Sequence, residues 1–313
     1  MIVTCTPNPS LDRTIEVDQL LRGEVQRVRA VTVQPGGKGI NVARALHRNG
    51  HEARAVAPLG GDEGELFARL VQQAGVPFTP VEVDEAIRVN ITLAEADGTT
   101  TKLNDRGPTL DVAARGRLLD ATLHAAAGAR WVAGCGSLPP SAGDDLYADL
   151  VTRARAADRR VAVDTSGPAL TGVVDAGPDL IKPNHHELAE LVGDELKTFA
   201  DVVGAARDVI GRGVGSVLVS LGGDGALLVT ADAVWFGESE PVTVRSTVGA
   251  GDSLLAGFLA GGGDGPESLA NGIAWATAAV SLPGSTMPAP DDLSLDAVRI
   301  ADTFDPDRPL EGD

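Results

Sequence analysis

A stretch of small residues that ends in a carboxylate lies near the C-terminal end of the chain: Thr247-Val248-Gly249-Ala250-Gly251-Asp252-Ser253. The backbone N–H groups of Gly249, Ala250 and Gly251 can approach a phosphate closely, and the helix predicted over 253–260 adds a positive dipole end. At the mouth of such an anion hole, Asp252 can accept a proton from an attacking hydroxyl. The stretch therefore indicates phosphoryl transfer, while a glycine-rich helix start capped by Asp252 stays open as the simpler interpretation.

A second glycine-rich stretch lies near the N-terminus: Pro35-Gly36-Gly37-Lys38-Gly39-Ile40-Asn41. It leads into a predicted helix that ends at Asn49-Gly50. Glycines such as Gly37 allow close backbone approach, Lys38 adds a point charge at the helix N-terminus, and Asn41 lies in the first turn, where a ligand can reach it. The Walker A spacing is absent. The stretch suits a phosphate or a polyhydroxylated ligand, and a flexible loop with a solvated lysine is the alternative.

Other polar residues follow predicted strands, where α/β folds bind ligands. Asp12 comes after the strand predicted over 2–6, and Asn184 and Glu187 follow the strand at 179–181. The Asn184–Glu187 spacing is that of a capping box, but it also suits a polar pair beside a Mg²⁺-bound triphosphate held through waters. The segment 221–226 predicts a tight turn that is open to a nucleotide, with a plain hairpin turn as the alternative.

Two kinds of pattern predict the fold. Residues 14–18, 27–33, 87–94 and 99–103 alternate between apolar and polar, as strands with one wet face do, and Asp97-Gly98 marks a hairpin. We expect these strands to form a small antiparallel lid that carries Arg88. From about residue 111, strands and helices alternate regularly, which predicts a mainly parallel sheet with helices on both faces. The tail from Asp302 is predicted to be frayed.

Composition narrows the classes of function. The net charge of −18 argues against nucleic acid and anionic membranes as partners. The two cysteines, Cys5 and Cys135, lie in apolar runs, as buried free thiols do in a reducing cytosol. The N-terminus lacks the features of a signal peptide, and no run of about 20 apolar residues could span a membrane. A cytoplasmic protein is predicted, without zinc-ligand spacing among its Cys and His residues.

These segments together resemble the PfkB/ribokinase-like carbohydrate kinase family, which includes ribokinase and the minor phosphofructokinases. The resemblance covers essentially the whole chain, and its most specific motifs are 36–43 and 248–253. Within the family, the chain is most similar to the 1-phosphofructokinase and tagatose-6-phosphate kinase subgroup, on Lys38 and on the segments 6–12 and 136–140. The family fold implied is a three-layer α/β arrangement. We expect one domain over 1–313, with lid strands inserted at about 12–34 and 87–104.

The resemblance also implies roles for individual residues. Asp252 would be the catalytic base, and Gly249, Ala250 and Gly251 would form the anion hole. Sugar hydroxyls and the substrate's existing phosphate would be bound by residues from both halves of the chain: Asp12, Arg27, Gly37, Lys38, Asn41, Arg88 and Ser137. The nucleotide and Mg²⁺, the latter reached by Glu187 through water, would be bound by Lys182, Asn184, Glu187, Ser220, Gly222, Gly223, Asp224, Gly225 and Asn271. Whether Asn104 or Arg106 contacts substrate stays open.

The activity implied is ATP-dependent phosphorylation of fructose 1-phosphate to fructose 1,6-bisphosphate with Mg²⁺. Such chemistry needs mainly positioning and charge stabilisation, which backbone amides, a base and a metal ion supply. Tagatose 6-phosphate or fructose 6-phosphate as acceptor is the nearer alternative, and a non-catalytic sugar-phosphate sensor is the remote one. A dinucleotide-dependent oxidoreductase lacks its glycine fingerprint. Family members often dimerise through the lid, so a homodimer is a further expectation.

Overall fold

The computed structural model describes residues 1–310 and contains a large sheet in the order β14-β13-β12-β11-β10-β9-β8-β1-β4-β5. Its strands are β1 (Ile2–Cys5), β4 (Ala53–Leu59), β5 (Phe78–Glu82), β8 (Trp131–Cys135), β9 (Arg160–Asp164), β10 (Leu180–Ile181), β11 (Ser216–Ser220), β12 (Ala226–Thr230), β13 (Val234–Ser239) and β14 (Val298–Ala301). Neighbouring strands from β5 to β11 are parallel, and β12, β13 and β14 continue the sheet in antiparallel pairs.

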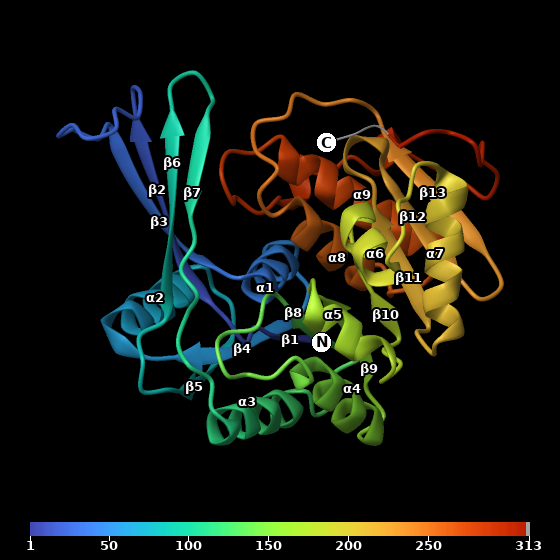
Figure 1. Cartoon of the computed structure of the whole chain (residues 1–313), viewed down its shortest axis with the longest axis horizontal. Helices are drawn as coiled ribbons and strands as arrows, with labels where there is room; N and C mark the ends of the chain where they lie inside the picture. Colours follow the sequence, from blue (N-terminus) through green and yellow to red (C-terminus); the bar gives the residue numbers. More distant parts are fainter. Residues whose placement is uncertain (311–313) are drawn as a thin grey trace.

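Helices cover both faces of this sheet (Figure 1). They are α1 (Lys38–Arg48), α2 (Gly61–Gln73), α3 (Val112–Ala125), α4 (Leu146–Ala156), α5 (Pro168–Val174), α6 (His185–Val192), α7 (Phe199–Gly211), α8 (Ala250–Ala260) and α9 (Gly265–Val280). None of them, within residues 1–310, is long and apolar enough to cross a membrane. The predicted three-layer α/β fold is confirmed.

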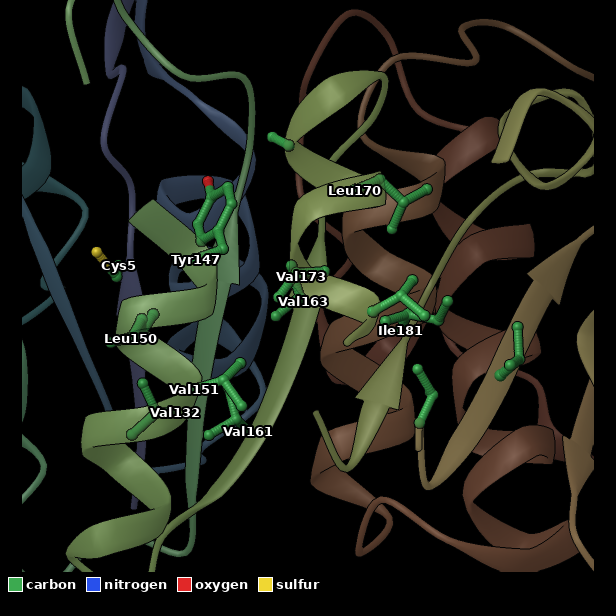
Figure 2. Close-up of a cluster of buried hydrophobic side chains, with 14 of the residues drawn as sticks. Cys5, Val132, Tyr147, Leu150, Val151, Val161, Val163, Leu170, Val173 and Ile181 are labelled. Carbon is green, nitrogen blue, oxygen red and sulfur yellow. The ribbon is translucent and has the colours of Figure 1, made fainter. Parts of the chain in front are cut away.

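Two hydrophobic clusters hold the layers together, one on each face of the sheet. Alternate residues of a strand point to opposite faces, so Ile2 of β1 joins the cluster under α1, α2, α8 and α9, while Val3 joins the one under α3, α4, α5 and α7. Figure 2 shows part of the second cluster, which includes Tyr147 and Leu150 of α4 and Val132 of β8. Cys5 and Cys135 are both buried free thiols.

The lid is a separate four-stranded sheet in the order β3-β2-β6-β7, which projects from the body (Figure 1). Its strands are β2 (Ser10–Val17), β3 (Ala30–Gly36), β6 (Arg88–Glu95) and β7 (Thr100–Leu103). The predicted hairpin at Gly98 joins β6 to β7, and β2 pairs with β3 antiparallel. The central pair β2–β6 is parallel, so the prediction of an antiparallel lid is wrong there. A crossover through α1, β4, α2 and β5 connects these two strands, and both run outward from the body.

The C-terminal tail departs from its prediction. Residues 302–310 carry many polar residues, but their backbone is bonded to the start of α7: the Phe199 N–H donates to the Arg308 carbonyl (3.1 Å), and the Ala200 N–H donates to that of Pro306 (2.8 Å). Phe304 packs on Phe199 with ring centroids 6.0 Å apart. The tail is therefore not frayed up to Leu310, and residues 311–313 lie outside the described residues.

Candidate active site

The predicted site residues collect at the edge of the sheet where the parallel strands end. Asp164 is the last residue of β9, Lys182 follows β10, and Ser137 lies two residues beyond β8. β1 lies inside the sheet, between β4 and β8, and the chain runs first to one side of it and then to the other. Such a topological switch point leaves a crevice at the carboxyl ends of the strands, which is where open α/β sheets bind ligands.

The start of α8 has the features of an anion hole. Gly249 takes a left-handed conformation (φ 83°) as the residue before the helix, and no side chain caps this end. The N–H groups of Gly251 and Asp252 consequently have no acceptor among residues 1–310. The Lys182 ammonium lies 3.3 Å from where a Cβ of Gly251 would be, so a side chain there would crowd it. Orphan amides, a helix dipole and a buried ammonium together favour a bound phosphate.

Asp252 stands beside this anion hole in the first turn of α8 and is only 7% exposed. The Asn41 amide donates to its Oδ2 atom (2.9 Å), while Arg44 donates to the Asn41 Oδ1 atom (3.1 Å). Arg44 thus fixes the orientation of the Asn41 amide, with its N–H₂ group toward the carboxylate. Burial, followed by the nearby negative charge of Asp164, raises the pKa of Asp252 to about 6. A carboxylate with such a pKa is ionised at neutral pH and basic enough to take a proton.

Asp164 is a fully buried carboxylate between two lysines. Lys38 Nζ donates to its Oδ1 atom (2.7 Å), and Lys182 Nζ lies 3.1 Å from Oδ2 in an ion pair without hydrogen-bond geometry. Burial alone would raise the pKa of Asp164, but the two ammonium groups outweigh it and hold that pKa below its ordinary value. The sequence alone indicated no role for Asp164. In the structure it connects Lys38 and Lys182, the two lysines predicted to bind ligands. An ionisable residue that ends the apolar run of β9 was the available signal.

A surface cavity of about 420 Å³ lies beside these groups at the base of the lid, and Asn8, Arg88, Arg106 and Ser137 line it. Arg88 donates to the backbone carbonyls of Asn8 (2.9 Å) and Asp105 (3.3 Å). Within residues 1–310 neither arginine has a carboxylate at ion-pair distance, and burial lowers the pKa of Arg88. Asp105 also lines the cavity and attracts Arg88 from beyond ion-pair distance. The two guanidinium groups, together with a hydroxyl, suit an anionic ligand.

Arg106 reaches the cavity through a constrained loop. The Asn8 amide donates to the Arg106 carbonyl (3.0 Å) and to Ser137 Oγ (3.4 Å), which ties the loop to the other cavity residues. The next residue is Gly107 (φ 89°), whose missing Cβ would lie 2.1 Å from Asn8 Oδ1. Asn104 is not among the cavity residues. Of the two residues whose role stayed open in the sequence, only Arg106 lines the cavity.

Three predicted substrate residues are not among those that line this cavity. Lys38 is bonded to Asp164 and is not among the cavity residues. Arg27 is exposed in the loop before β3, outside the strand predicted over 27–33, and the fold does not bring it to the cavity of its own chain. Asp12 lies on β2 rather than in a loop, where its Oδ1 atom accepts from Ser10 Oγ (2.7 Å) and the Asn90 amide (3.1 Å).

The glycines before α1 have a packing reason. A Cβ at Gly36 would lie 2.1 Å from Asp12 Oδ2, and one at Gly37 would lie 2.8 Å from Thr6 Cγ2. Gly37 also has φ 105°, which side-chain-bearing residues rarely adopt. These glycines allow the start of α1 to pack closely against β1 and β2. This packing places Asn41 within hydrogen-bond distance of Asp252.

The proposed nucleotide side lies along β10 and β11. Asn184 and Glu187 form a complete capping box on α6, so the structural interpretation of their spacing is confirmed. This leaves Glu187 Oε1 without a hydrogen-bond partner among residues 1–310, and Glu187 is close enough to Lys38 to raise its pKa. Asn184 forms a β-bridge with Ser220, which joins this helix start to the turn that follows β11.

The turn between β11 and β12, hereafter the glycine turn (residues 220–225), is a short 3-10 turn over Gly222–Asp224. Apart from the adjoining residues of the turn, no atom of residues 1–310 lies within 4 Å of where a Cβ of Gly223 would be, so this side is open in the described chain. Asp224 was predicted to line the nucleotide site, but its side chain is 1% exposed and pairs with Arg308 at 2.8 Å. The open part of the turn is backbone.

Asn271 is placed away from the start of α8. Its Nδ2 atom donates to the Glu267 carbonyl (3.1 Å) and lies 2.9 Å from where a Cβ of Gly261 would be, at the far end of α8 from Asp252. Nine residues of helix separate Asp252 from Gly261, or about 14 Å. Because α8 and α9 form an antiparallel pair, the C-terminal turn of α9 approaches the anion hole, as the bond from the Arg245 N–H to the Val280 carbonyl (2.8 Å) indicates. That Asn271 borders adenine stays a prediction.

A magnesium ion carried by a nucleotide fits these residues. Among residues 1–310, no three His, Cys, Asp or Glu side chains are arranged to hold a metal ion by themselves. Mg²⁺ at nucleotide sites takes most of its ligands from phosphates and waters and needs only one or two protein carboxylates. The half-buried Glu187 carboxylate, with one uncommitted oxygen, suits a contact through water.

Comparison with known proteins identifies the family. The family model described as "pfkB family carbohydrate kinase" matches residues 6–292. The chain is 38% identical to 1-phosphofructokinase of Haloferax volcanii over 297 residues, which cover 94% of this chain and 95% of that protein. It is 39% identical over 262 residues to ATP-dependent 6-phosphofructokinase isozyme 2 of Mycobacterium tuberculosis (83% and 77% covered). Phosphofructokinase-2 from Escherichia coli, solved with substrates and products, superposes with a TM-score of 0.87 at 35% identity (93% and 96% covered). The chain belongs to the pfkB family of carbohydrate kinases.

Proposed function

We propose that the protein is an ATP-dependent, Mg²⁺-dependent sugar-phosphate kinase that converts fructose 1-phosphate to fructose 1,6-bisphosphate. The observation that carries the proposal is the cavity lined by Arg88, Arg106 and Ser137, which is separate from the anion hole at α8. A kinase of free sugars needs one phosphate site, for the transferred group. Two anion sites at one sheet edge suit a substrate that already carries a phosphate.

The residues support one reaction sequence. The acceptor hydroxyl gives its proton to Asp252, its oxygen forms a bond to the γ-phosphorus, and the bond from that phosphorus to the ADP oxygen breaks. The amides of Gly251 and Asp252 and the Lys182 ammonium stabilise the charge on the transferred group. Asn41 orients the Asp252 carboxylate. Mg²⁺, when bound with ATP, neutralises phosphate charge, and Glu187 holds its water shell.

The competing acceptors are fructose 6-phosphate and tagatose 6-phosphate, which would be phosphorylated at the other end of the sugar. Fructose 6-phosphate has specific support, because the chain is as similar to 6-phosphofructokinase isozyme 2 as to the 1-phosphofructokinases. The deciding experiment measures kcat/KM with ATP for all three ketose phosphates and for free fructose. We expect fructose 1-phosphate to give the highest value. A higher value with a 6-phosphate would replace the proposed acceptor, and a preference for free fructose would remove the sugar-phosphate assignment.

Arg106→Gln is expected to raise the KM for the sugar phosphate roughly tenfold, because one charge-assisted hydrogen bond to the phosphate is lost. The KM for ATP should not change, since Arg106 lines only the cavity at the lid. Steady-state kinetics with each substrate varied in turn measures the split. Arg13→Gln is the matched control: it removes the same charge from an exposed lid position that does not line the cavity. An equal rise in both variants would attribute the effect to net charge instead.

The lid also supports a homodimer. Its outer parts expose large apolar side chains, among them Val28 (49%), Val31 (52%) and Leu103 (56%). Burying such residues against a second copy removes apolar surface from water. Light scattering on the purified protein should give the mass of two chains, and Val31→Asp should shift it toward one. A wild-type mass of one chain at assay concentrations would contradict the dimer.

A further inference from the structure

The C-terminal segment that ends the described chain, hereafter the C-terminal strap (residues 302–310), lies outside the region matched by the family model. It passes beside α7 and β13 (Figure 1), and three backbone hydrogen bonds attach it to residues 197–200. The side chain of Phe304 adds a hydrophobic contact: its ring centroid lies 6.0 Å from that of Phe199 and 6.1 Å from that of Phe236. The strap is thus a packed part of the domain.

One side chain of the strap reaches the glycine turn. Arg308 donates to Asp224 Oδ1 (2.8 Å) and to Glu238 Oε2 (3.5 Å). Its guanidinium carbon lies 5.0 Å from the ring centre of Phe199 and 5.4 Å from that of Phe236. Two carboxylates and two aromatic faces therefore fix one guanidinium, which the backbone of the strap holds in turn.

The Arg308–Asp224 ion pair matters to the glycine turn because Asp224 is a buried residue of that turn. The Asp224 carboxylate is 1% exposed, and burying a carboxylate is costly unless it is paired, as it is here with Arg308. The turn is narrow: the Leu221 N–H donates to the Gly225 carbonyl (2.9 Å), and a Cβ at Gly225 would lie 2.1 Å from the Gly237 carbonyl oxygen. A shift of Asp224 would therefore move the open backbone at Gly223.

We propose that the C-terminal strap positions the glycine turn through the Arg308–Asp224 ion pair and so sets the affinity for the nucleotide. The inference rests on the proposed function, which assigns the glycine turn to ATP. Arg308 is a positioning residue, because its own contacts are to Asp224, Glu238 and two phenylalanines rather than to the open side of the turn. The opposite side of the turn is bonded to Pro183, beside the capping box of α6.

The test compares nucleotide binding in Arg308→Ala and wild type by calorimetric titration with Mg·ADP. We expect roughly tenfold weaker binding and a matching rise in the KM for ATP, because the buried carboxylate next to the binding backbone loses its ion pair with Arg308. The KM for the sugar phosphate should stay at its wild-type value. Arg308→Lys should recover part of the affinity, and thermal unfolding of each variant shows that titrations are made on folded protein.

Arg212→Ala is the control, because Arg212 is about as exposed as Arg308 and also pairs with a carboxylate at 3.1 Å, but its partner Asp175 is exposed and lies at the other end of α7. Its nucleotide affinity should equal that of wild type. Equal affinities of Arg308→Ala and wild type would overturn the positioning role. Failure of the wild-type protein to bind Mg·ADP would instead overturn the nucleotide assignment in the proposed function.

Adding Asp224→Asn separates positioning from direct contact. If Arg308 acts through its ion pair with the buried carboxylate, Asp224→Asn should cost less affinity in the Arg308→Ala background than in wild type, because that ion pair is already absent there. If Asp224 contacted the nucleotide itself, the two losses would add. Additive losses would therefore count against the proposal.

Discussion

Asp252→Asn should lose most of its turnover, by roughly 10²- to 10⁴-fold in kcat, which is the range that a general base contributes. The amide cannot accept the proton of the acceptor hydroxyl. It has nearly the shape of the carboxylate, and its oxygen can still accept the hydrogen bond from Asn41. Binding of the sugar phosphate and of Mg·ADP should therefore remain, and the loss should appear in kcat rather than in KM.

The same substitution should make the protein more stable. The pKa of Asp252 is about 6 in the folded chain against an ordinary value of 3.8. The folded surroundings therefore favour the protonated carboxyl, and keeping it ionised at neutral pH costs folding free energy. The difference corresponds to at most about 3 kcal/mol above pH 6, and it disappears as the pH falls below the ordinary pKa of 3.8, where the carboxyl becomes neutral in both states. Asp252→Asn removes this cost, so its melting temperature should rise by several degrees at pH 8.

The two effects are measured together, by kinetics and by thermal unfolding at pH 8 and pH 4. Asp62→Asn is the matched control, because Asp62 also lies in the first turn of a helix, α2, but is exposed. It should change neither kcat nor the melting temperature appreciably. Near-wild-type turnover in Asp252→Asn would show that another group takes the proton. A large loss of stability at pH 8 would contradict the pKa argument.

The sequence predicted well what short segments decide. The alternation of apolar residues indicated the lid strands, the regular strand–helix order indicated the parallel sheet, and Asp97-Gly98 marked a hairpin that the structure contains. The spacing of Asn184 and Glu187 predicted the capping box that caps α6. Each of these features depends on hydrogen bonds and side chains within a few residues of one another, so local patterns carry the information.

Contacts between residues that are far apart in the sequence could not be predicted from local patterns. Asn41 and Asp252 are 211 positions apart, and only the packing of α1 on α8 shows that one positions the other. The position of Asn271 relative to Asp252 likewise depends on how α8 and α9 pair, which no local motif records. The tail was expected to be frayed from its polar composition, while its anchors, Phe304 and Arg308, act through residues far away in the sequence.

Asp164→Asn is expected to cost about 3–5 kcal/mol in the free energy of unfolding at neutral pH, the typical penalty for removing one partner from a buried ion pair. The penalty arises mainly at Lys182, whose ammonium would lose its carboxylate partner while the side chain is only 4% exposed. Lys38 is more exposed and can turn toward water. The pKa of Asp164 is below its ordinary value, so its ionised form stabilises the fold at neutral pH. That contribution is lost as the pH falls through the folded-state pKa, and the difference from wild type should shrink.

The exposed pair Asp175–Arg212 supplies the control for stability. Asp175→Asn removes a carboxylate that is 79% exposed from a similar ion pair, and such pairs contribute about 0–1 kcal/mol. Denaturant titrations of both variants at pH 7.5, and again well below the ordinary Asp pKa of 3.8, should therefore separate the buried carboxylate from the exposed one. Equal small losses in the two variants would mean that Lys182 finds another partner when Asp164 is neutral.

Asp164→Asn should also shift the acid limb of activity to lower pH. In wild type, kcat/KM should fall as the pH drops through about 6, because Asp252 becomes protonated. The negative charge of Asp164 contributes to the raised pKa of Asp252, so its removal lowers that pKa. A sugar phosphate itself titrates near pH 6, which affects both enzymes equally, so the difference between their profiles carries the test. If kcat/KM of Asp164→Asn fell at the same pH as in wild type, or at a higher pH, the fall would not report the protonation of Asp252. The identity of the base would then rest on Asp252→Asn alone.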